Sequence, residues 1–323
     1  MKAAVHHRYG PPDVVRVAEV DRPAAGDGDV LVRVHATTVN RTDCAYRAAR
    51  PFFVRAATGL TRPRRAVLGT EFAGVVEAVG AGVTAFAAGD RVFGYNEGAF
   101  GTHAEYLAVP AGGMIAAIPA GVSFAEAAPG TEGAHYALSF IRASRVRAGQ
   151  DVLVYGATGA IGSAAVQLLK DLGVTVTAVC DTANLELVRG LGADRVVDYT
   201  AEDFTRDART YDAVFDAVGK STFGRCKRLL KPRGKYLSSD LGPWWQNLLL
   251  PPATRLLGGR RVVFPFPVHG QEVVRHLGDL IGSGRFRPVV DRRYPLDEIV
   301  AAHRHAESGR KVGNIVIDVV PPA

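Results

Sequence analysis

The chain has 323 residues, of which 47% are hydrophobic and 22% are charged. This length suits about two domains, and the composition is that of a folded globular protein, which excludes a disordered chain, a collagen and a coiled coil. The 39 Lys and Arg residues against 32 Asp and Glu give a formal charge of +7. A basic balance is compatible with nucleic acid, an anionic membrane surface or a phosphate-bearing ligand, but no basic helix or basic-aromatic repeat indicates nucleic acid.

The cysteines and the N-terminus indicate a cellular compartment. Cys44, Cys180 and Cys226 are far apart and form no CxxC pair, so the sequence predicts no disulfide framework and fits a reducing compartment. The first ten residues lack the apolar segment of a signal peptide. The most apolar stretches, 107–119 and 244–252, are too short and too interrupted to span a bilayer. We therefore expect a cytoplasmic protein with no nucleic-acid partner and no membrane partner.

The first third of the chain has the pattern of β-strands. β-Branched runs separated by glycines predict strands at 1–5, 14–20, 30–38, 71–79 and 90–93. Val30 to Val34 alternates with a period of two, which is typical of a half-buried strand. Many short strands without intervening helices predict a barrel-like or partly open antiparallel module.

From Phe124 onward, helices and strands alternate. A helix at 124–143 is followed by predicted strands at 151–155, 174–180, 195–198, 213–217, 234–238 and 261–264. Helices at 161–172, 183–191 and 221–230 separate them, which predicts right-handed βαβ units on a parallel sheet. A helix at 272–283 and strands near 289–294 and 315–319 return to the first module. The predicted fold class is α/β, with a Rossmann domain at 125–265 inside a β-rich domain made of 1–124 and 266–323.

A glycine-rich turn follows the strand at 151–155. Its spacing, GxxGxxG over residues 156–162, is one residue looser than the usual GxGxxG. Glycines let a backbone approach a pyrophosphate, and the N-terminus of the next helix offers free N–H groups and a positive dipole end. The alternative is a tight turn without a ligand. The predicted cofactor-binding residues are Gly156, Thr158, Gly159, Ala160, Ile161 and Gly162.

Asp181 ends the second strand of this unit, nineteen residues beyond Gly162. An acidic residue here accepts hydrogen bonds from the ribose of NAD(H), whereas the 2′-phosphate of NADP(H) requires a cation. Ala183 and its neighbours offer none, although Arg189 and Arg195 are close enough in sequence to reach inward. Asp181 is equally compatible with capping the helix that follows. The sequence therefore slightly favours NADH.

The whole chain resembles the medium-chain dehydrogenase/reductase superfamily, in particular its zinc-free quinone oxidoreductase branch. The matching motifs are, in the family's order, 40–43 (NRTD), 69–76 (GTEFAGVV), 88–92 (AGDRV), 156–162 (GATGAIG), 191–194 (LGAD), 215–219 (FDAVG) and 313–316 (GNIV). The resemblance implies a GroES-like domain made from both chain ends, a Rossmann domain between them and an active site in the cleft. It also implies a homodimer, NADPH as the usual cofactor, and further cofactor-binding residues at Tyr199, Val218, Gly219 and Asn314.

The resemblance also implies the absence of zinc. Zinc-dependent relatives have Cys, His and Cys or Asp ligands, and the corresponding positions here are Asn40, Thr70 and about Pro129, which are not a plausible ligand set. The four-cysteine lobe expected after residue 94 is missing. We expect His6, His7, His303 and His305 on strand or helix surfaces, in solvated or packing roles rather than as metal ligands. The prediction is that no metal binds.

Without a Lewis acid, hydrogen-bond donors must polarise a carbonyl. By resemblance, Asn40 and Tyr46 are candidate catalytic residues, although Asn40 with Asp43 also has the pattern of a helix-capping pair and Tyr46 that of a packed aromatic. Residues 131–136 (TEGAHY) depart from the family's Leu-Thr-Ala and place an ionisable Glu132 near the hydride-transfer site. Glu132 is the third candidate, either as an acid–base group or as an ion-pair partner.

The predicted function is an NAD(P)H-dependent reductase that transfers a hydride to a small apolar quinone or α,β-unsaturated carbonyl without zinc. The alternative is a cofactor-binding relative with a non-reductive role, in binding, structure or biosynthetic tailoring. Residues 240–261 contain the only two tryptophans. This segment is either an apolar substrate wall or a contact with a partner subunit.

Overall fold

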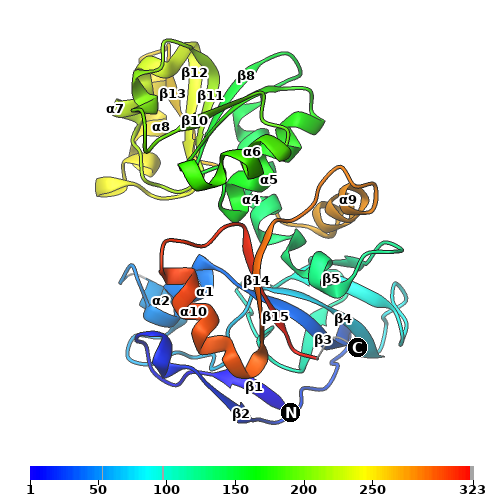
Figure 1. Cartoon of the computed structure of the whole chain (residues 1–323). Helices are drawn as coiled ribbons and strands as arrows, with labels where there is room; N and C mark the ends of the chain where they lie inside the picture. Colours follow the sequence, from blue (N-terminus) through cyan, green and yellow to red (C-terminus); the bar gives the residue numbers. More distant parts are fainter. Residues whose placement is uncertain (53, 97, 321–323) are drawn as a thin grey trace. The chain divides into compact units, whose positions relative to one another are not determined.

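The computed structural model of the protein describes residues 1–52, 54–96 and 98–320 (Figure 1). The chain forms two compact units. Unit 1 contains Met1–Glu132 and His269–Ala323, and unit 2 contains Gly133–Val268. The predicted divisions, after residues 124 and 265, lie eight and three residues before these limits. In Figure 1, unit 1 has the blue, cyan, orange and red segments, and unit 2 the green and yellow ones.

Unit 1 is built on one mixed sheet with the strand order β14-β15-β3-β4-β5-β7, and β6 pairs with β3. The strands are β3 (Asp29–Val39), β4 (Glu71–Val79), β5 (Arg91–Tyr95), β6 (Tyr106–Pro110), β7 (Ile115–Ala117), β14 (Val290–Pro295) and β15 (Asn314–Asp318). A separate hairpin joins β1 (Lys2–Val5) to β2 (Arg16–Glu19). The C-terminal β15 pairs antiparallel with β3, with Ile315 opposite Val39. This pairing confirms that the C-terminal segment returns to the N-terminal module.

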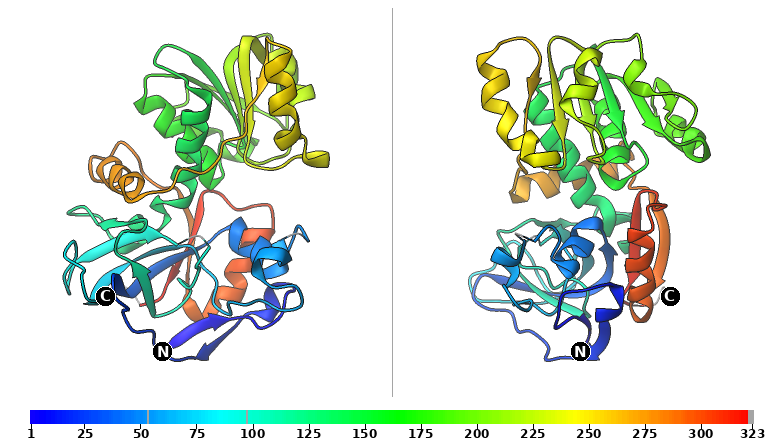
Figure 2. Two further views of the ribbon diagram at one scale, coloured as in Figure 1. Left: turned by 180° about the vertical axis from the view of Figure 1, so that it is seen from behind. Right: turned by 90° about the vertical axis from the view of Figure 1, so that its left-hand side faces the viewer.

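The helices of unit 1 include α1 (Arg41–Ala48), α2 (Val54–Thr58), α3 (Phe124–Ala127), α9 (Gln271–Gly282) and α10 (Ile299–Glu307). A buried cluster containing Val39, Cys44, Ile299 and Ile315 packs α1 and α10 against the sheet. Figures 1 and 2 show the red α10 beside the blue α1.

Two histidines predicted on surfaces are buried, which corrects that expectation. His6 and His303 expose 2% and 0% of their surface. His6 Nδ1 bonds the Ala66 carbonyl at 2.8 Å, and His303 Nδ1 lies 3.6 Å from Cys44 Sγ. Burial lowers the pKa of both rings, so they pack as neutral groups.

Unit 2 contains a parallel sheet with the order β10-β9-β8-β11-β12-β13. Its strands are β8 (Asp151–Tyr155), β9 (Thr175–Cys180), β10 (Arg195–Asp198), β11 (Tyr211–Asp216), β12 (Leu230–Ser238) and β13 (Arg261–Val262). Its helices are α4 (Glu132–Ser144), α5 (Ala160–Asp171), α6 (Leu185–Gly190), α7 (Phe223–Cys226) and α8 (Gln246–Leu256). The first residue of α4, Glu132, belongs to unit 1. The strand order reverses between β8 and β11, and ligands of such sheets bind at the carboxyl ends of the strands at that point.

Two predicted helices differ from the structure. The helix predicted at 124–143 is interrupted at Pro129, which has no N–H to donate, so α3 ends at Ala127 and α4 begins at Glu132. The helix predicted at 221–230 ends early, and β12 begins at Leu230. The sequence also missed α8, whose Pro251 and Pro252 conceal its helical pattern. Within the described part of the chain, no helix is long and apolar enough to cross a membrane.

Candidate functional site

The glycine-rich turn links β8 to α5. Gly156 has a φ of +82°, and a Cβ there would lie 2.8 Å from the Cβ of Val218. A Cβ on Gly162 would lie 2.1 Å from the Gly156 carbonyl oxygen. The packing of the chain itself therefore requires both glycines. Gly159 differs, because the nearest atom to a Cβ there would be 3.7 Å away.

The start of α5 has the properties of an anion site. Gly159 is the residue before its first turn, and no side chain of the described residues caps that turn. Ala160 and Ile161 add no charge. Uncapped amides and the helix dipole attract a phosphate, and the space beside Gly159 admits one. The turn therefore fits the diphosphate of a dinucleotide.

A second turn follows β11 and lies against the first. The buried Asp216 carboxylate accepts hydrogen bonds from the amides of Val218 at 3.3 Å, Gly219 at 2.8 Å and Ser221 at 2.8 Å. Burial nevertheless raises the pKa of Asp216. Val218 is the residue that a Cβ on Gly156 would meet, so the turn held by Asp216 packs against the glycine-rich turn.

Asp181 lies at the end of β9 and precedes a short 3-10 turn. Its Oδ1 accepts a 2.5 Å hydrogen bond from the Asn184 side chain. Arg189 pairs with Glu186, and Arg195 pairs with Asp207. Both arginines that the sequence placed within reach of Asp181 are therefore engaged elsewhere.

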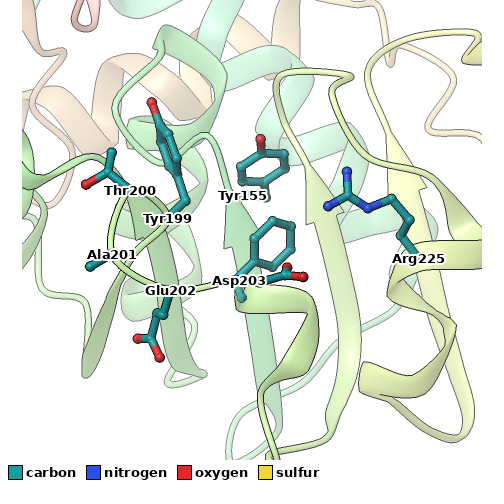
Figure 3. A pocket seen from close by; sticks show the side chains of 8 residues that line it. Tyr155, Tyr199, Thr200, Ala201, Glu202, Asp203 and Arg225 are labelled. Carbon is teal, nitrogen blue, oxygen red and sulfur yellow. The ribbon is translucent and has the colours of Figure 1, made fainter.

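A cavity of about 400 Å³ opens beside Tyr155, the last residue of β8. Tyr155 stacks on Phe204 with ring centroids 4.6 Å apart, and Tyr199 stands at its edge at 6.4 Å. Figure 3 shows the guanidinium of Arg225 extending toward these rings from the other side. Sequence analysis missed Arg225, because α7 carries no motif.

In unit 1, two buried glutamates form the centre of a polar cluster. Glu71 exposes none of its surface, and its Oε1 accepts from the amide of Glu132 at 2.5 Å. The amide and hydroxyl of Thr131 donate to the same oxygen at 3.1 and 2.8 Å. Its Oε2 accepts from Thr38 and from Asn40 Nδ2, both at 2.7 Å. Glu71 thus receives five hydrogen bonds and fixes the start of α4.

Glu132 receives three hydrogen bonds from side chains on other elements. Its Oε1 accepts from Thr42 Oγ1 at 2.5 Å, and its Oε2 accepts from Thr70 Oγ1 at 2.8 Å and Asn40 Nδ2 at 3.3 Å. Asn40 and Thr70 are buried, and Thr42 is half-buried. Of the three donors to Glu132, only Thr42 is therefore partly exposed at the surface of unit 1.

Burial makes Glu132 an acid that keeps its proton at neutral pH. Loss of hydration, followed by the charges of Glu71 and Asp43, raises the pKa of Glu132 to about 8. Burial also raises the pKa of Glu71. Because Glu71 has more donors, it ionises first and Glu132 retains the proton of the pair. Burial lowers the pKa of the nearby Lys311 ammonium. The negative charges of the two glutamates partly offset this lowering.

The remaining candidates have structural contacts as well. Asp43 accepts from the amide of Asn40 at 2.8 Å and caps α1. Asn40 Oδ1 accepts no hydrogen bond from any residue that the structure describes. Tyr46 is half-buried, with its ring edge-on to Phe100 at 4.6 Å. Asn314, on β15, is buried and donates to the Val289 carbonyl at 3.0 Å.

Comparison with known proteins places this geometry in a family. The model of the alcohol dehydrogenase GroES-like domain matches residues 26–120, and that of the zinc-binding dehydrogenases matches 191–317. A tomato (Solanum lycopersicum) 2-methylene-furan-3-one reductase is 31% identical over 99% of this chain and 80% of its own length. An Arabidopsis thaliana chloroplastic NADPH-dependent alkenal/one oxidoreductase is 30% identical with the same coverage. The chain belongs to the medium-chain dehydrogenase/reductase superfamily.

A solved structure refines this placement. The quinone oxidoreductase of Coxiella burnetii superposes with a TM-score of 0.87 and 26% identity, over 99% of both chains. Together with the named reductases, it places this medium-chain dehydrogenase/reductase in the quinone oxidoreductase-like branch, whose members are oxidoreductases.

The polar cluster around Glu71 and Glu132 contains two residues, Asn40 and Thr70, for which the sequence resemblance implied a correspondence to zinc-ligand positions. Both donate to Glu132. Among the described residues, no group of three or more His, Cys, Asp or Glu is arranged to hold a metal ion. Sequence analysis found Asn40 and Glu132 but missed Glu71 and Thr42. The sequence signal that could have identified Glu71 as a site residue is its position as a charged residue at the start of the largely apolar strand β4.

Proposed function

We propose that this protein is an NAD(P)H-dependent reductase of quinones or α,β-unsaturated carbonyls that works without zinc, with Glu132 as its acid. The observation that carries this proposal is the buried carboxyl held by Asn40, Thr70 and Thr42, whose pKa is raised to about 8. A neutral carboxylic acid can donate a hydrogen bond and a proton at neutral pH. The nicotinamide cofactor supplies the hydride.

The cluster defines a role for each residue. Glu132 donates a hydrogen bond to the substrate oxygen as negative charge develops on it, and then transfers its proton. Asn40 acts as a positioning residue, because its amide protons already go to Glu71 and Glu132. Glu71 holds the start of α4, and its negative charge adds to burial in raising the pKa of Glu132. Tyr46 is the second candidate donor, by virtue of its phenol.

The test compares Glu132→Gln and Glu132→Asp with the wild type. NADH and NADPH oxidation is followed by absorbance with a panel of quinones and enones. We expect kcat of the Gln variant with enones to fall about 100-fold or more, because the amide cannot give up a proton. We expect wild-type kcat to decline above pH 8 as Glu132 ionises. Unchanged activity of the Gln variant would remove Glu132 from the reaction.

For the cofactor, we propose binding at the turn of residues 156–162, with NADH favoured by Asp181 and Ala183. Two observations favour NADPH instead: the Arabidopsis relative is named NADPH-dependent, and Arg225 brings a cation to the cavity beside Tyr155. Calorimetric titration of both cofactors into wild type, Asp181→Ala and Arg225→Ala measures the preference. NADH preference requires that Asp181→Ala weakens NADH binding. Loss of NADPH binding alone in Arg225→Ala would instead assign a phosphate contact.

The same assays test the non-reductive alternative. If neither cofactor is oxidised with any acceptor while one of them raises the melting temperature, the protein binds the cofactor without reducing these substrates. We further propose a homodimer, from the family resemblance, and a cytoplasmic location, from the cysteines and the N-terminal sequence. Sedimentation at several protein concentrations measures the assembly state.

A further inference from the structure

One long segment of unit 1 carries arginines and no acidic residue. Residues 44–70 contain six arginines and no Asp, Glu or Lys. Arg47 is buried and pairs with Glu307. Four of the others are exposed, and we refer to them as the arginine patch: Arg50, Arg62, Arg64 and Arg65. Among the described residues, no side chain forms an ion pair with these four guanidiniums, so they are available to an external anion.

Hydrogen bonds hold the backbone that carries this patch. The Tyr9 hydroxyl lies 2.8 Å from Thr58 Oγ1 and donates to the Gly59 carbonyl at 2.7 Å. The amide of Arg64 donates to the Thr58 carbonyl at 2.8 Å. The end of α2 and the chain after it therefore form a fixed turn, and Figure 1 shows α2 at the outer edge of unit 1.

Both ends of the segment lie at the polar cluster around Glu132. Asp43 Oδ1 accepts from the Gly69 amide at 3.1 Å, so the chain leaves and returns at one place. The next residue, Thr70, donates to Glu132 at 2.8 Å. Arg65 is four residues before Gly69, a length of chain that spans at most about 14 Å. A substrate whose carbonyl meets Glu132 can therefore extend to the arginine patch.

An exposed aromatic ring accompanies the arginines. Phe52 is 73% exposed, and the guanidinium of Arg55 lies 5.1 Å from the centroid of its ring. Guanidinium groups bind phosphate oxygens in pairs of hydrogen bonds, and an aromatic ring stacks on a nucleobase. A simple carboxylate needs only one guanidinium and no ring. The combination therefore favours a nucleotide that bears more than one phosphate charge.

We propose that the substrate of this protein is an α,β-unsaturated carbonyl compound joined to a nucleoside diphosphate, as in an α,β-unsaturated thioester of coenzyme A. The phosphates bind the arginine patch, the base stacks on Phe52, and the carbonyl oxygen accepts a hydrogen bond from Glu132. This inference rests on the proposed function. The hydride of NAD(P)H goes to the β-carbon, the nicotinamide is oxidised, and the proton of Glu132 completes the saturated product.

Two thioesters with the same unsaturated group provide the first test. Crotonyl-coenzyme A carries the nucleotide, and crotonyl-N-acetylcysteamine carries neither phosphate nor base. We expect kcat/KM to be at least about tenfold higher with the coenzyme A compound, because several charged contacts add to its binding. Added salt should lower this ratio. Equal values of kcat/KM for the two thioesters would overturn the proposal.

A triple variant of the arginine patch localises the effect. Arg62→Ser/Arg64→Ser/Arg65→Ser should weaken the binding of crotonyl-coenzyme A about tenfold, as measured by calorimetry. Its kcat/KM for the neutral thioester and its affinity for the nicotinamide cofactor should stay as in the wild type. Unchanged binding of crotonyl-coenzyme A would overturn the assignment of the patch.

A matched control removes the same charge elsewhere. Arg16, Arg33 and Arg292 are exposed on β2, β3 and β14 of unit 1. Their triple change to serine should leave the binding of both thioesters unchanged. Equal weakening by the two triple variants would mean that net charge, not the patch, attracts the ligand, and would contradict the proposal.

Phe52→Leu tests the base contact, because leucine keeps an apolar side chain but has no ring. We expect it to weaken crotonyl-coenzyme A about fivefold and to leave crotonyl-phosphopantetheine, which has a phosphate and no base, unaffected. Equal binding of crotonyl-coenzyme A by this variant and the wild type would overturn the nucleotide assignment.

Calorimetry separates this inference from the reductase assignment, since binding needs no turnover. Patch-dependent binding of crotonyl-coenzyme A without its reduction would support the ligand class and contradict the proposed function. Reduction of neutral enones without patch-dependent binding would contradict only this inference.

Discussion

The raised pKa of Glu132 predicts an unusual pH dependence of stability. Between its ordinary value near 4.5 and about 8, the folded protein holds a proton on Glu132 that the unfolded chain has released. Stability therefore falls as pH rises through this window, by at most about 1.4 kcal/mol per pH unit. This is the reverse of a salt-bridged carboxylate, whose contribution is lost as pH falls.

Glu132→Gln isolates this contribution. The amide has nearly the same shape and cannot ionise, and the hydroxyls of Thr42 and Thr70 can rotate to accept from it. Between pH 6 and pH 8, the wild type should lose about 2 kcal/mol more stability than the variant. For a domain of the size of unit 1, this difference in stability corresponds to a difference of roughly 4–8 °C in Tm.

The assay is thermal unfolding of both proteins, followed by far-ultraviolet circular dichroism, at pH 6, 7 and 8 without cofactor. Titrating groups that do not interact with Glu132 are common to both proteins and cancel in the difference. The variant should be the more stable of the two at pH 8 and above. Parallel loss of Tm by both proteins would mean that Glu132 is ionised throughout, and the reasoning from burial would fail.

Three further predictions concern other residues. Lys311→Met removes a positive charge near Glu132, so the alkaline decline of kcat should move to higher pH. A pH–rate profile of the variant measures the pH of this decline. A decline at the same pH as in the wild type would mean that Lys311 and Glu132 are not coupled. Gly162→Ala should lose about 1–3 kcal/mol of stability because its Cβ meets a carbonyl oxygen. Gly159→Ala should change stability by no more than about 1 kcal/mol and should lose cofactor affinity. Urea unfolding measures the stability of each variant and calorimetry its cofactor affinity, and equal destabilisation of the two variants would contradict the packing argument. Asp181→Ala/Ala183→Lys should shift kcat/KM toward NADPH, and an unchanged ratio would remove Asp181 from ribose recognition.

Sequence patterns predicted the fold because its signals are local. The apolar strand at 151–155, the turn at 156–162 and the strands that follow specify a parallel sheet without knowledge of tertiary contacts. The interruption at Pro129 was visible in principle, since proline cannot donate within a helix. The helix α8 was not, because two consecutive prolines argue against a helix even though its inner face is held by tertiary contacts.

The candidate site was only partly accessible for the same reason. Gly156 to Gly162 act within one local segment, so the motif identified them. The acid cluster joins Asn40, Thr70, Glu71 and Glu132, which come from three separate segments of the chain. No spacing rule predicts such a meeting, and the high pKa of Glu132 arises from burial that only the fold creates. Sequence analysis therefore identified Asn40 and Glu132 separately, without predicting that they meet each other and Glu71.

The central claim is that Glu132 carries a proton at neutral pH. The most direct measurement is the titration of its side-chain carboxyl by carbon-13 NMR in protein labelled at glutamate, with Glu132→Gln identifying the signal. The structure predicts a titration midpoint near pH 8 for this carboxyl. A midpoint near 4.5, the ordinary value for glutamate, would contradict the proposed role of Glu132 as the acid.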